Sequence, residues 1–146
     1  MTKSVMLFMA AALLALTACG ALARRELVLP AAEDLEKAAV TAGGLDWTAA
    51  DAGAIAGLVE TLKQSVVWNT GRASVQDVPD KGDGLVRIEF YFKYGGSSVL
   101  FLYQEGGRLF LEQPYQGIYE MDGSLGVWLQ NRLALGPAGL KTTKWE

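Results

Sequence analysis

The chain of 146 residues contains no histidine and a single cysteine, Cys19. Without histidine, it lacks the usual general base at neutral pH, the commonest metal ligand and the residue that most often activates a catalytic serine or cysteine. A single cysteine excludes an intrachain disulfide and a zinc site built from several thiolates. The sequence therefore argues against many hydrolytic and metal-dependent activities, and we expect no cofactor and no metal site.

An excess of positive charge is also missing. The chain has 13 basic and 16 acidic residues, which gives a net charge of -3. This charge supplies no basic field to attract nucleic acid, so we expect no nucleic-acid partner. Hydrophobic residues make up 51% of the chain and charged residues 20%, which is a globular composition. The length fits one domain.

A hydrophobic run at the N-terminus has the character of a targeting segment. Lys3 precedes an unbroken apolar run from Val5 to Leu16, which suits a secretory signal but is short for a bilayer span. The run ends in Leu-Thr-Ala-Cys at 16–19, which resembles the bacterial lipoprotein box. In such proteins the signal is cut before the cysteine, which then carries a diacylglycerol, and two acyl chains give stable anchoring. We therefore predict a lipoprotein signal peptide at 1–18 and lipidation of Cys19.

Two alternatives remain open for the N-terminus. One is an ordinary secretory signal cut at a small residue, with Cys19 incidental, and the other is an uncleaved membrane anchor. In the lipoprotein interpretation, residues 19–25 are a lipidated tether, 26–135 form a single domain and 136–146 are a flexible tail. The protein is then expected on the extracytoplasmic face of the cell membrane, held there by the lipid on Cys19.

Three predicted strands joined by two Gly-Gly turns form the centre of the domain. Strict alternation over Leu85–Tyr94 places apolar residues on one face and polar residues on the other, as in an antiparallel strand with one wet face. Val99–Tyr103 is apolar on both faces, which predicts a central position in the sheet. Arg108–Gln113 alternates again and ends at Pro114.

Weaker patterns supply the remaining elements. We expect short strands at Glu26–Leu29 and Lys37–Thr41, a helix over Thr48–Gln64 and a second helix over Ser124–Leu133 with Asp122 as its N-cap. The predicted fold class is α+β. An antiparallel sheet of four to five strands packs against one central helix, and the short C-terminal helix covers an end or edge of the sheet.

Two segments carry a resemblance to known proteins: Ser-Val-Gln-Asp-Val-Pro at 74–79 and Glu-Gln-Pro-Tyr-Gln-Gly-Ile-Tyr at 112–119. Both are similar to segments in a family of small lipoproteins from Gram-positive bacteria that is known only as a domain of unknown function. The order of elements is similar as well, from about Glu26 to Leu133, while the tail beyond Leu135 departs from the pattern. The resemblance implies an extracytoplasmic, membrane-anchored α+β domain and implies no catalytic residues.

The segment Gln113–Tyr119 is the best candidate for a binding site. Tyrosine rings and glutamine amides together suit a sugar, a glycan or an extended peptide, since each ring offers an apolar face and a polar tip. The candidate binding residues are Gln113, Tyr115, Gln116 and Tyr119. The alternative is structural, and the frequency of packed turns favours it: Pro114 ends a strand, Gly117 supplies a turn, and the tyrosine rings close the sheet edge.

Acidic residues provide two further hypotheses. Asp77, Asp80 and Asp83 suit calcium by residue type, but their spacing does not match the EF-hand, so a solvated loop is the preferred interpretation. Glu89 and Glu112 offer paired carboxylates of the kind that glycosidases use. We expect both glutamates on a wet sheet face without a cleft, which argues against catalysis.

The expected function is that of a noncatalytic binding or interaction module in the cell envelope. Its partner is expected to be an envelope protein or a glycan. The alternatives are an enzyme that acts on cell-wall glycan through its carboxylates, and an inhibitor or sensor domain.

Overall fold

The computed structural model describes residues 26–134. The predicted signal peptide at 1–18, the tether at 19–25 with Cys19, and the tail at 136–146 lie outside the described residues. Within 26–134, neither helix is long and apolar enough to cross a bilayer.

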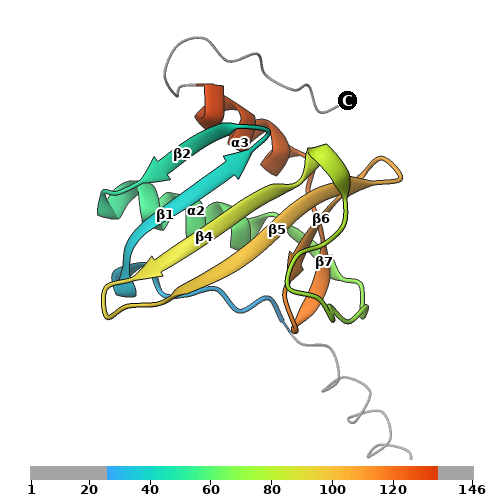
Figure 1. Ribbon diagram of the computed structural model, residues 1–146, viewed down its shortest axis with the longest axis horizontal. Helices are drawn as coiled ribbons and strands as arrows, with labels where there is room; N and C mark the ends of the chain where they lie inside the picture. Colours follow the sequence, from blue (N-terminus) through green and yellow to red (C-terminus); the bar gives the residue numbers. More distant parts are fainter. Residues whose placement is uncertain (1–25, 135–146) are drawn as a thin grey trace, which may run out of the picture.

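Seven antiparallel strands form one sheet in the order β2-β1-β4-β5-β6-β7-β3 (Figure 1). The strands are β1 (Leu35–Ala42), β2 (Leu45–Ala49), β3 (Val66–Asn69), β4 (Val86–Phe92), β5 (Ser97–Glu105), β6 (Arg108–Gln113) and β7 (Gly117–Met121). Short 3-10 turns η1 (Ala32–Asp34) and η2 (Gly82–Gly84) precede β1 and β4. β5 is the fourth of the seven strands, which confirms the central position predicted from its two apolar faces.

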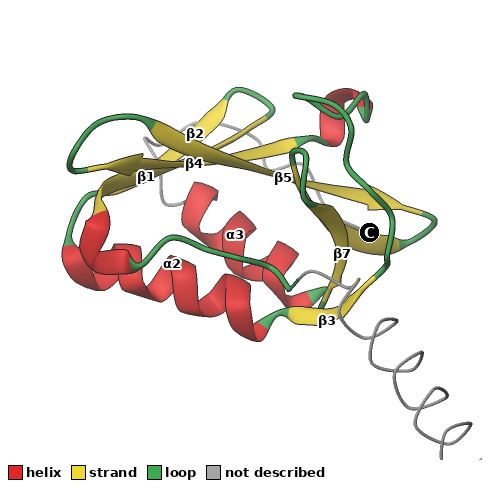
Figure 2. Ribbon diagram, turned by 90° about the horizontal axis from the view of Figure 1, so that it is seen from below, coloured by secondary structure: helices red, strands yellow, loops and turns green. Residues whose placement is uncertain are grey.

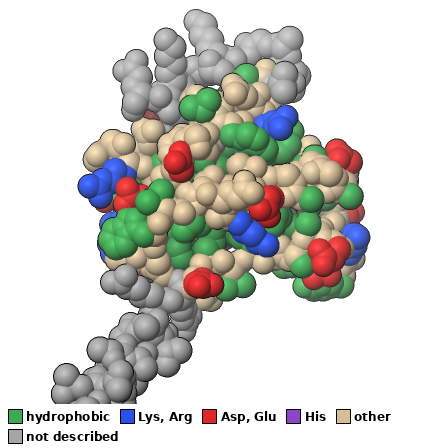
Figure 3. All heavy atoms as spheres, turned by 180° about the vertical axis from the view of Figure 1, so that it is seen from behind, with side chains coloured by type: hydrophobic (Ala, Val, Ile, Leu, Met, Phe, Trp, Pro, Cys, Tyr) green, Lys and Arg blue, Asp and Glu red, His purple; other side chains and the backbone are tan. Residues whose placement is uncertain are grey.

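Two helices cover the same face of this sheet, as Figure 2 shows: α2 (Ala52–Gln64) and α3 (Ser124–Ala134). Both bury one apolar side in the main core, α2 through Ile55, Leu58, Val59 and Leu62, and α3 through Leu125, Leu129 and Leu133. Each such side chain contributes about 1.5–3 kcal/mol when fully buried. Seen from the helix side in Figure 3, acidic and basic side chains are interspersed among hydrophobic ones.

The α+β class and the antiparallel sheet are confirmed, but the predicted strand number and helix arrangement are wrong. The sheet has seven strands instead of four to five, and two helices, α2 and α3, cover one face instead of one central helix, with α3 packed against the edge strand β2. Trp47 of β2 and Trp128 of α3 meet edge to face with ring centroids 5.9 Å apart. The strands that the prediction missed are β2, β3 and β7, each of only four or five residues.

Two element boundaries also differ from the prediction. The expected strand at Glu26–Leu29 is irregular, and the segment instead runs beside the β6–β7 turn. Thr48 lies in β2 opposite Ala39 of β1, so it does not begin a helix. The N-cap of α2 is Asp51, whose carboxylate accepts a 2.8 Å hydrogen bond from the backbone N–H of Ala54. The second helix begins where predicted, with the Ser124 N–H donating to the carboxylate of Asp122.

The sheet face opposite the helices, which we call the outer face, is divided into two halves. Residues 70–84, the covering segment, cross it over β5, β6 and β7 (Figures 1 and 2). Beneath the covering segment, Tyr103, Phe110 and Ile118 form a second, smaller core that Leu85 joins from the side. The other half of the outer face, on β1, β4 and the start of β5, has no such cover among the described residues.

Candidate functional site

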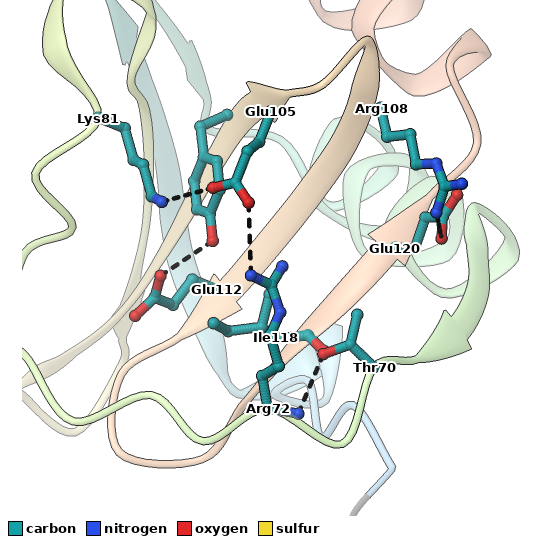
Figure 4. Close-up of polar contacts among 9 residues, drawn as sticks. Thr70, Arg72, Lys81, Glu105, Arg108, Glu112, Ile118 and Glu120 are labelled. Carbon is teal, nitrogen blue, oxygen red and sulfur yellow. Dashed lines mark hydrogen bonds and ion pairs between the residues drawn. The ribbon is translucent and has the colours of Figure 1, made fainter.

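A buried carboxylate lies under the covering segment. Glu112 of β6 is 1% exposed, and its two oxygens accept hydrogen bonds from different elements. The Ser74 hydroxyl donates to Oε1 at 2.7 Å. The Tyr103 hydroxyl donates to Oε2 at 3.2 Å, and this bond is the dashed line that ends on Glu112 in Figure 4. The expectation that Glu112 faces water is therefore wrong, because residues 70–84 fold over the strand that carries it. The same expectation is wrong for Glu89, which is 8% exposed among its own hydrogen-bond donors.

This buried environment changes the pKa of Tyr103. Burial, together with the charge of Glu112 and the hydrogen bond to it, raises the pKa of Tyr103 from 10.0 to about 12. The ammonium of Lys81 lies 4.7 Å from the centre of the same ring, on the side of the covering segment. Tyr103 is therefore held neutral at physiological pH and acts as a hydrogen-bond donor.

Ion pairs and ring contacts hold the covering segment at its rim. Glu105 accepts from Lys81 at 2.7 Å and from Arg72 at 3.5 Å, as Figure 4 shows. The hydrogen bond and charge of Lys81, followed by the weaker influence of Arg72, keep the pKa of Glu105 below its usual value. Arg72 also stacks over the Phe110 ring at 5.0 Å. These pairs are exposed and screened by water, so they position the segment more than they stabilise it.

The β6–β7 turn meets the covering segment as well. Its residue Tyr115 has a φ of +60°, and the backbone N–H of Gln116 donates to the carbonyl of Gln113 at 2.9 Å. A positive φ at the third position is what a type II turn requires, and proline is common at the second. The Tyr115 hydroxyl donates to Asp77 at 2.7 Å. The two segments that carry the family resemblance, 74–79 and 112–119, are thus joined by two side-chain hydrogen bonds.

The four candidate binding residues do not form one surface. Gln113 donates its amide to the carbonyl of Val28 at 2.9 Å, Tyr115 is 60% exposed, and Gln116 is exposed beside it. Tyr119 lies on the opposite face of the sheet, 1% exposed in the core with the two helices. Three of the four therefore surround the β6–β7 turn, and the fourth belongs to the interior.

The carboxylates proposed for metal binding or catalysis are not brought together. Among residues 26–134, no group of three or more acidic or cysteine side chains is arranged to hold a metal ion. Asp77 is engaged by Tyr115 instead. Glu89 on β4 and Glu112 on β6 share the outer face, but the whole of β5 lies between their strands.

Glu89 organises the uncovered half of the outer face. It accepts from the Tyr91 hydroxyl and the Ser97 hydroxyl, each at 2.8 Å, and forms a short ion pair with Arg87. Partial burial works to raise the pKa of Glu89, but the hydrogen bonds from Ser97, Tyr91 and Arg87 and the charge of Arg87 outweigh it and lower the pKa. The carboxylate is therefore held ionised.

We call this uncovered half the open face and define it by the side chains of Lys37, Thr41, Arg87, Glu89, Tyr91 and Ser97. The ammonium of Lys37 lies 4.7 Å from the centre of the Tyr91 ring. The alternation of β4 already placed Arg87, Glu89 and Tyr91 on one polar face. Lys37 joins the open face because β1 pairs with β4, and no pattern in the sequence predicts this pairing.

A shallow depression of about 260 Å³ adjoins the open face where β1 turns into β2. Its lining residues are Thr41, Ala42, Gly43, Gly44, Leu45, Asp46, Leu85 and Arg87. Glycines 43 and 44 both have positive φ values, as the short turn requires, and they add no side chain to its wall. The depression offers the Arg87 guanidinium and the Asp46 carboxylate to a small polar group.

Comparisons with known proteins identify similar sequences and a similar fold. A model of the family DUF5301, described as "Domain of unknown function (DUF5300)", matches residues 23–120. A solved structure described as "NMR structure of the protein from Ruminococcus gnavus" is 26% identical, with a TM-score of 0.58, over 66% of this chain and 92% of that one. No curated protein matches. The prediction of a family of unknown function is confirmed, while the lipoprotein signal stays a prediction.

Proposed function

The chain belongs to the DUF5301 family of domains of unknown function, and we propose that it is a lipoprotein, anchored at the extracytoplasmic face of the membrane, whose domain is a noncatalytic interaction module. The observation that carries the anchoring is that the only cysteine of the chain stands at the end of Leu-Thr-Ala-Cys, directly after the apolar run. Among the described residues, the first regular element is η1 at Ala32–Asp34, so cleavage before Cys19 removes none of the described fold.

Lipidation is tested by metabolic labelling with an alkyne fatty acid in a bacterial host. The Cys19→Ala chain is expected to lose the label and to leave the membrane fraction, or to retain its signal peptide. Thr17→Ser is the matched control, because it preserves a small residue at that position and the thiol of Cys19. Undiminished label on the Cys19→Ala chain would overturn the proposal.

The use of the carboxylates supports a noncatalytic role. A general acid or base must reach the proton it transfers, within about 2.6–3.2 Å. Glu112 is enclosed, with Ser74 and Tyr103 as its donors, and Glu89 is already engaged by three donors of the open face. If the protein were a glycan-acting enzyme, Glu89→Gln or Glu112→Gln would abolish turnover while the fold is kept. The proposal instead expects that the wild-type protein and both variants show no turnover of cell-wall glycan.

The open face is the surface that best suits a polar envelope partner, protein or glycan. It presents Lys37, Arg87 and Tyr91 around a fixed negative charge, and the depression beside it adds concave polar surface. Tyr91 offers a ring face as well as a hydroxyl, the combination used in recognition of sugars and of polar protein surfaces. Mixed charge of this kind sets specificity and encounter rate more than affinity.

Site-specific photo-crosslinking in intact cells tests this surface. A photoreactive residue at the exposed Thr41 is expected to give adducts that Arg87→Glu diminishes. The same residue at the exposed Asn131 of α3, on the other side of the sheet, serves as the control and should give none. Adducts from Asn131 alone would place the interaction on the helices and refute the assignment to the open face.

A further inference from the structure

Four exposed hydrophobic side chains belong to segments that hydrogen bonds bring together where the described chain begins. Val28 is 70% exposed, Val75 79%, Val78 59% and Tyr115 60%. Hydrogen bonds connect the three segments that carry them: Gln113 of the β6–β7 turn donates to the carbonyl of Val28, and Tyr115 of the same turn donates to Asp77, which lies between the two other valines. We call Val28, Val75, Val78 and Tyr115 the apolar end.

The apolar end lies close to the site proposed for the lipid. The described chain begins at Glu26, which follows Cys19 by 26 - 19 = 7 residues. An extended chain spans at most about 3.3–3.6 Å per residue, so Glu26 stands within roughly 25 Å of the anchor. In Figure 1 the described chain starts at the lower edge of the molecule beside the β6–β7 turn, whereas α3 lies at the upper edge.

The chemistry of the apolar end suits a bilayer surface. Exposed apolar clusters on soluble domains mark sites of contact with membranes or proteins. Here the exposed side chains belong to the β6–β7 turn, to the covering segment and to the first residues of the described chain. Projecting valines add apolar area that enters the acyl boundary, and tyrosine prefers the level of the lipid headgroups.

We propose that Val28, Val75, Val78 and Tyr115 form a membrane-contacting surface that rests on the lipid bilayer once Cys19 is anchored. This inference rests on the proposed lipidation. It also fixes the orientation of the domain: with the lower edge of Figure 1 against the lipid, the open face stands upright beside the membrane and remains accessible to a partner.

The test uses the full chain, expressed with its own signal and purified from membranes. Because Cys19 is the only native cysteine, its lipidation leaves the thiol introduced by Val78→Cys as the one available for an environment-sensitive NBD dye. The matched control is Val127→Cys on α3, where the native valine is similarly exposed at 56%. Both proteins are placed in phosphatidylcholine vesicles with and without doxyl-labelled lipid.

The expected result is that NBD at position 78 shifts to shorter wavelength and is quenched by the doxyl lipid, while NBD at position 127 keeps its aqueous spectrum. Val75→Cys should repeat the response of position 78. Equal spectra at 78 and 127, or quenching at 127 alone, would overturn the proposal. So would a response at 78 that follows protein concentration and ignores the doxyl lipid, since this assigns the apolar end to a second copy of the chain.

Failure of the proposed lipid anchor and failure of the proposed membrane-contacting surface give different experimental results. The mass of the N-terminal peptide reports whether Cys19 carries lipid, independently of the dye. An unlipidated Cys19 overturns the proposed function and this inference with it. A lipidated Cys19 with an aqueous spectrum at position 78 overturns the membrane-contacting surface alone.

Discussion

Ser74 and Glu112, 38 residues apart in sequence, are joined by a 2.7 Å hydrogen bond in which the serine hydroxyl donates to a carboxylate that is 1% exposed. This bond ties the covering segment to β6 and connects the two segments that carry the family resemblance. Tyr103 supplies the other donor to the same carboxylate. The half of the outer face that is closed to solvent therefore depends on a small polar network inside an apolar cluster.

The first prediction concerns this bond. Ser74→Ala leaves the buried carboxylate of Glu112 with one donor fewer and is expected to lower the free energy of unfolding by about 1–3 kcal/mol. Ser97→Ala is the matched control, since Ser97 donates to Glu89 at a similar distance but is itself exposed, and Glu89 keeps two other donors, Arg87 and Tyr91. Its loss should stay below about 1 kcal/mol. Urea denaturation of both variants measures the difference, and equal losses would refute the role of burial.

The second prediction is a loss of stability at alkaline pH. The pKa of Tyr103 is raised in the folded state to about 12 from 10.0, so its contribution is present below pH 10 and is lost as the pH rises through about 12. Tyr103→Phe is expected to flatten the decline of unfolding free energy over this range, although it lowers stability at neutral pH by removing a donor to Glu112. If the unfolding free energy of Tyr103→Phe declined as steeply with pH as that of the wild type, Tyr103 would not be the group responsible.

The third prediction concerns acid. The pKa of Glu89 lies below its ordinary value of 4.5 in the folded state, so the carboxylate stabilises the fold above pH 4.5, and this contribution is lost as the pH falls through the lowered pKa. Glu89→Gln should remove this part of the acid sensitivity in denaturation experiments run at a series of pH values. Glu36→Gln, at an exposed position of β1, is the control and should keep the wild-type profile.

The fourth prediction addresses the β6–β7 turn. Tyr115 has a φ of +60°, a conformation that costs a residue with a side chain about 1–2 kcal/mol and that glycine adopts freely. Tyr115→Ala is expected to destabilise the protein, because it keeps this cost and loses the bond to Asp77. Tyr115→Gly should be more stable than Tyr115→Ala by about 1 kcal/mol. Thermal unfolding of the two variants measures this difference. Equal stability of Tyr115→Ala and Tyr115→Gly would argue against the observed turn geometry.

The long strands were predictable because their patterns are local. The alternation of β4 and β6 assigns their faces without any knowledge of partners, and the doubly apolar β5 marks the centre of the sheet. The short strands were missed because they lack such a local pattern. β3 and β7, with four and five residues, carry too little pattern, and they pair with each other across some 50 residues of sequence that includes three other strands.

The candidate site was predicted only where its residues share a local pattern. The sequence placed Arg87, Glu89 and Tyr91 on one polar face, and the structure confirms that they lie together. The burial of Glu112 was missed because an irregular segment without a hydrophobic period, residues 70–84, covers it. Tyr119 lies in β7 and is buried in the core, whereas Tyr115 is in the turn, so two tyrosines of one motif have unrelated environments.

The central claim, that this domain is held at the membrane by a lipid on Cys19, is tested most directly by mass spectrometry of the N-terminal peptide of the protein isolated from membranes. The expected peptide begins at Cys19 and carries the mass of a diacylglycerol. A mature chain that begins at any other residue, or that begins at an unmodified Cys19, would contradict it.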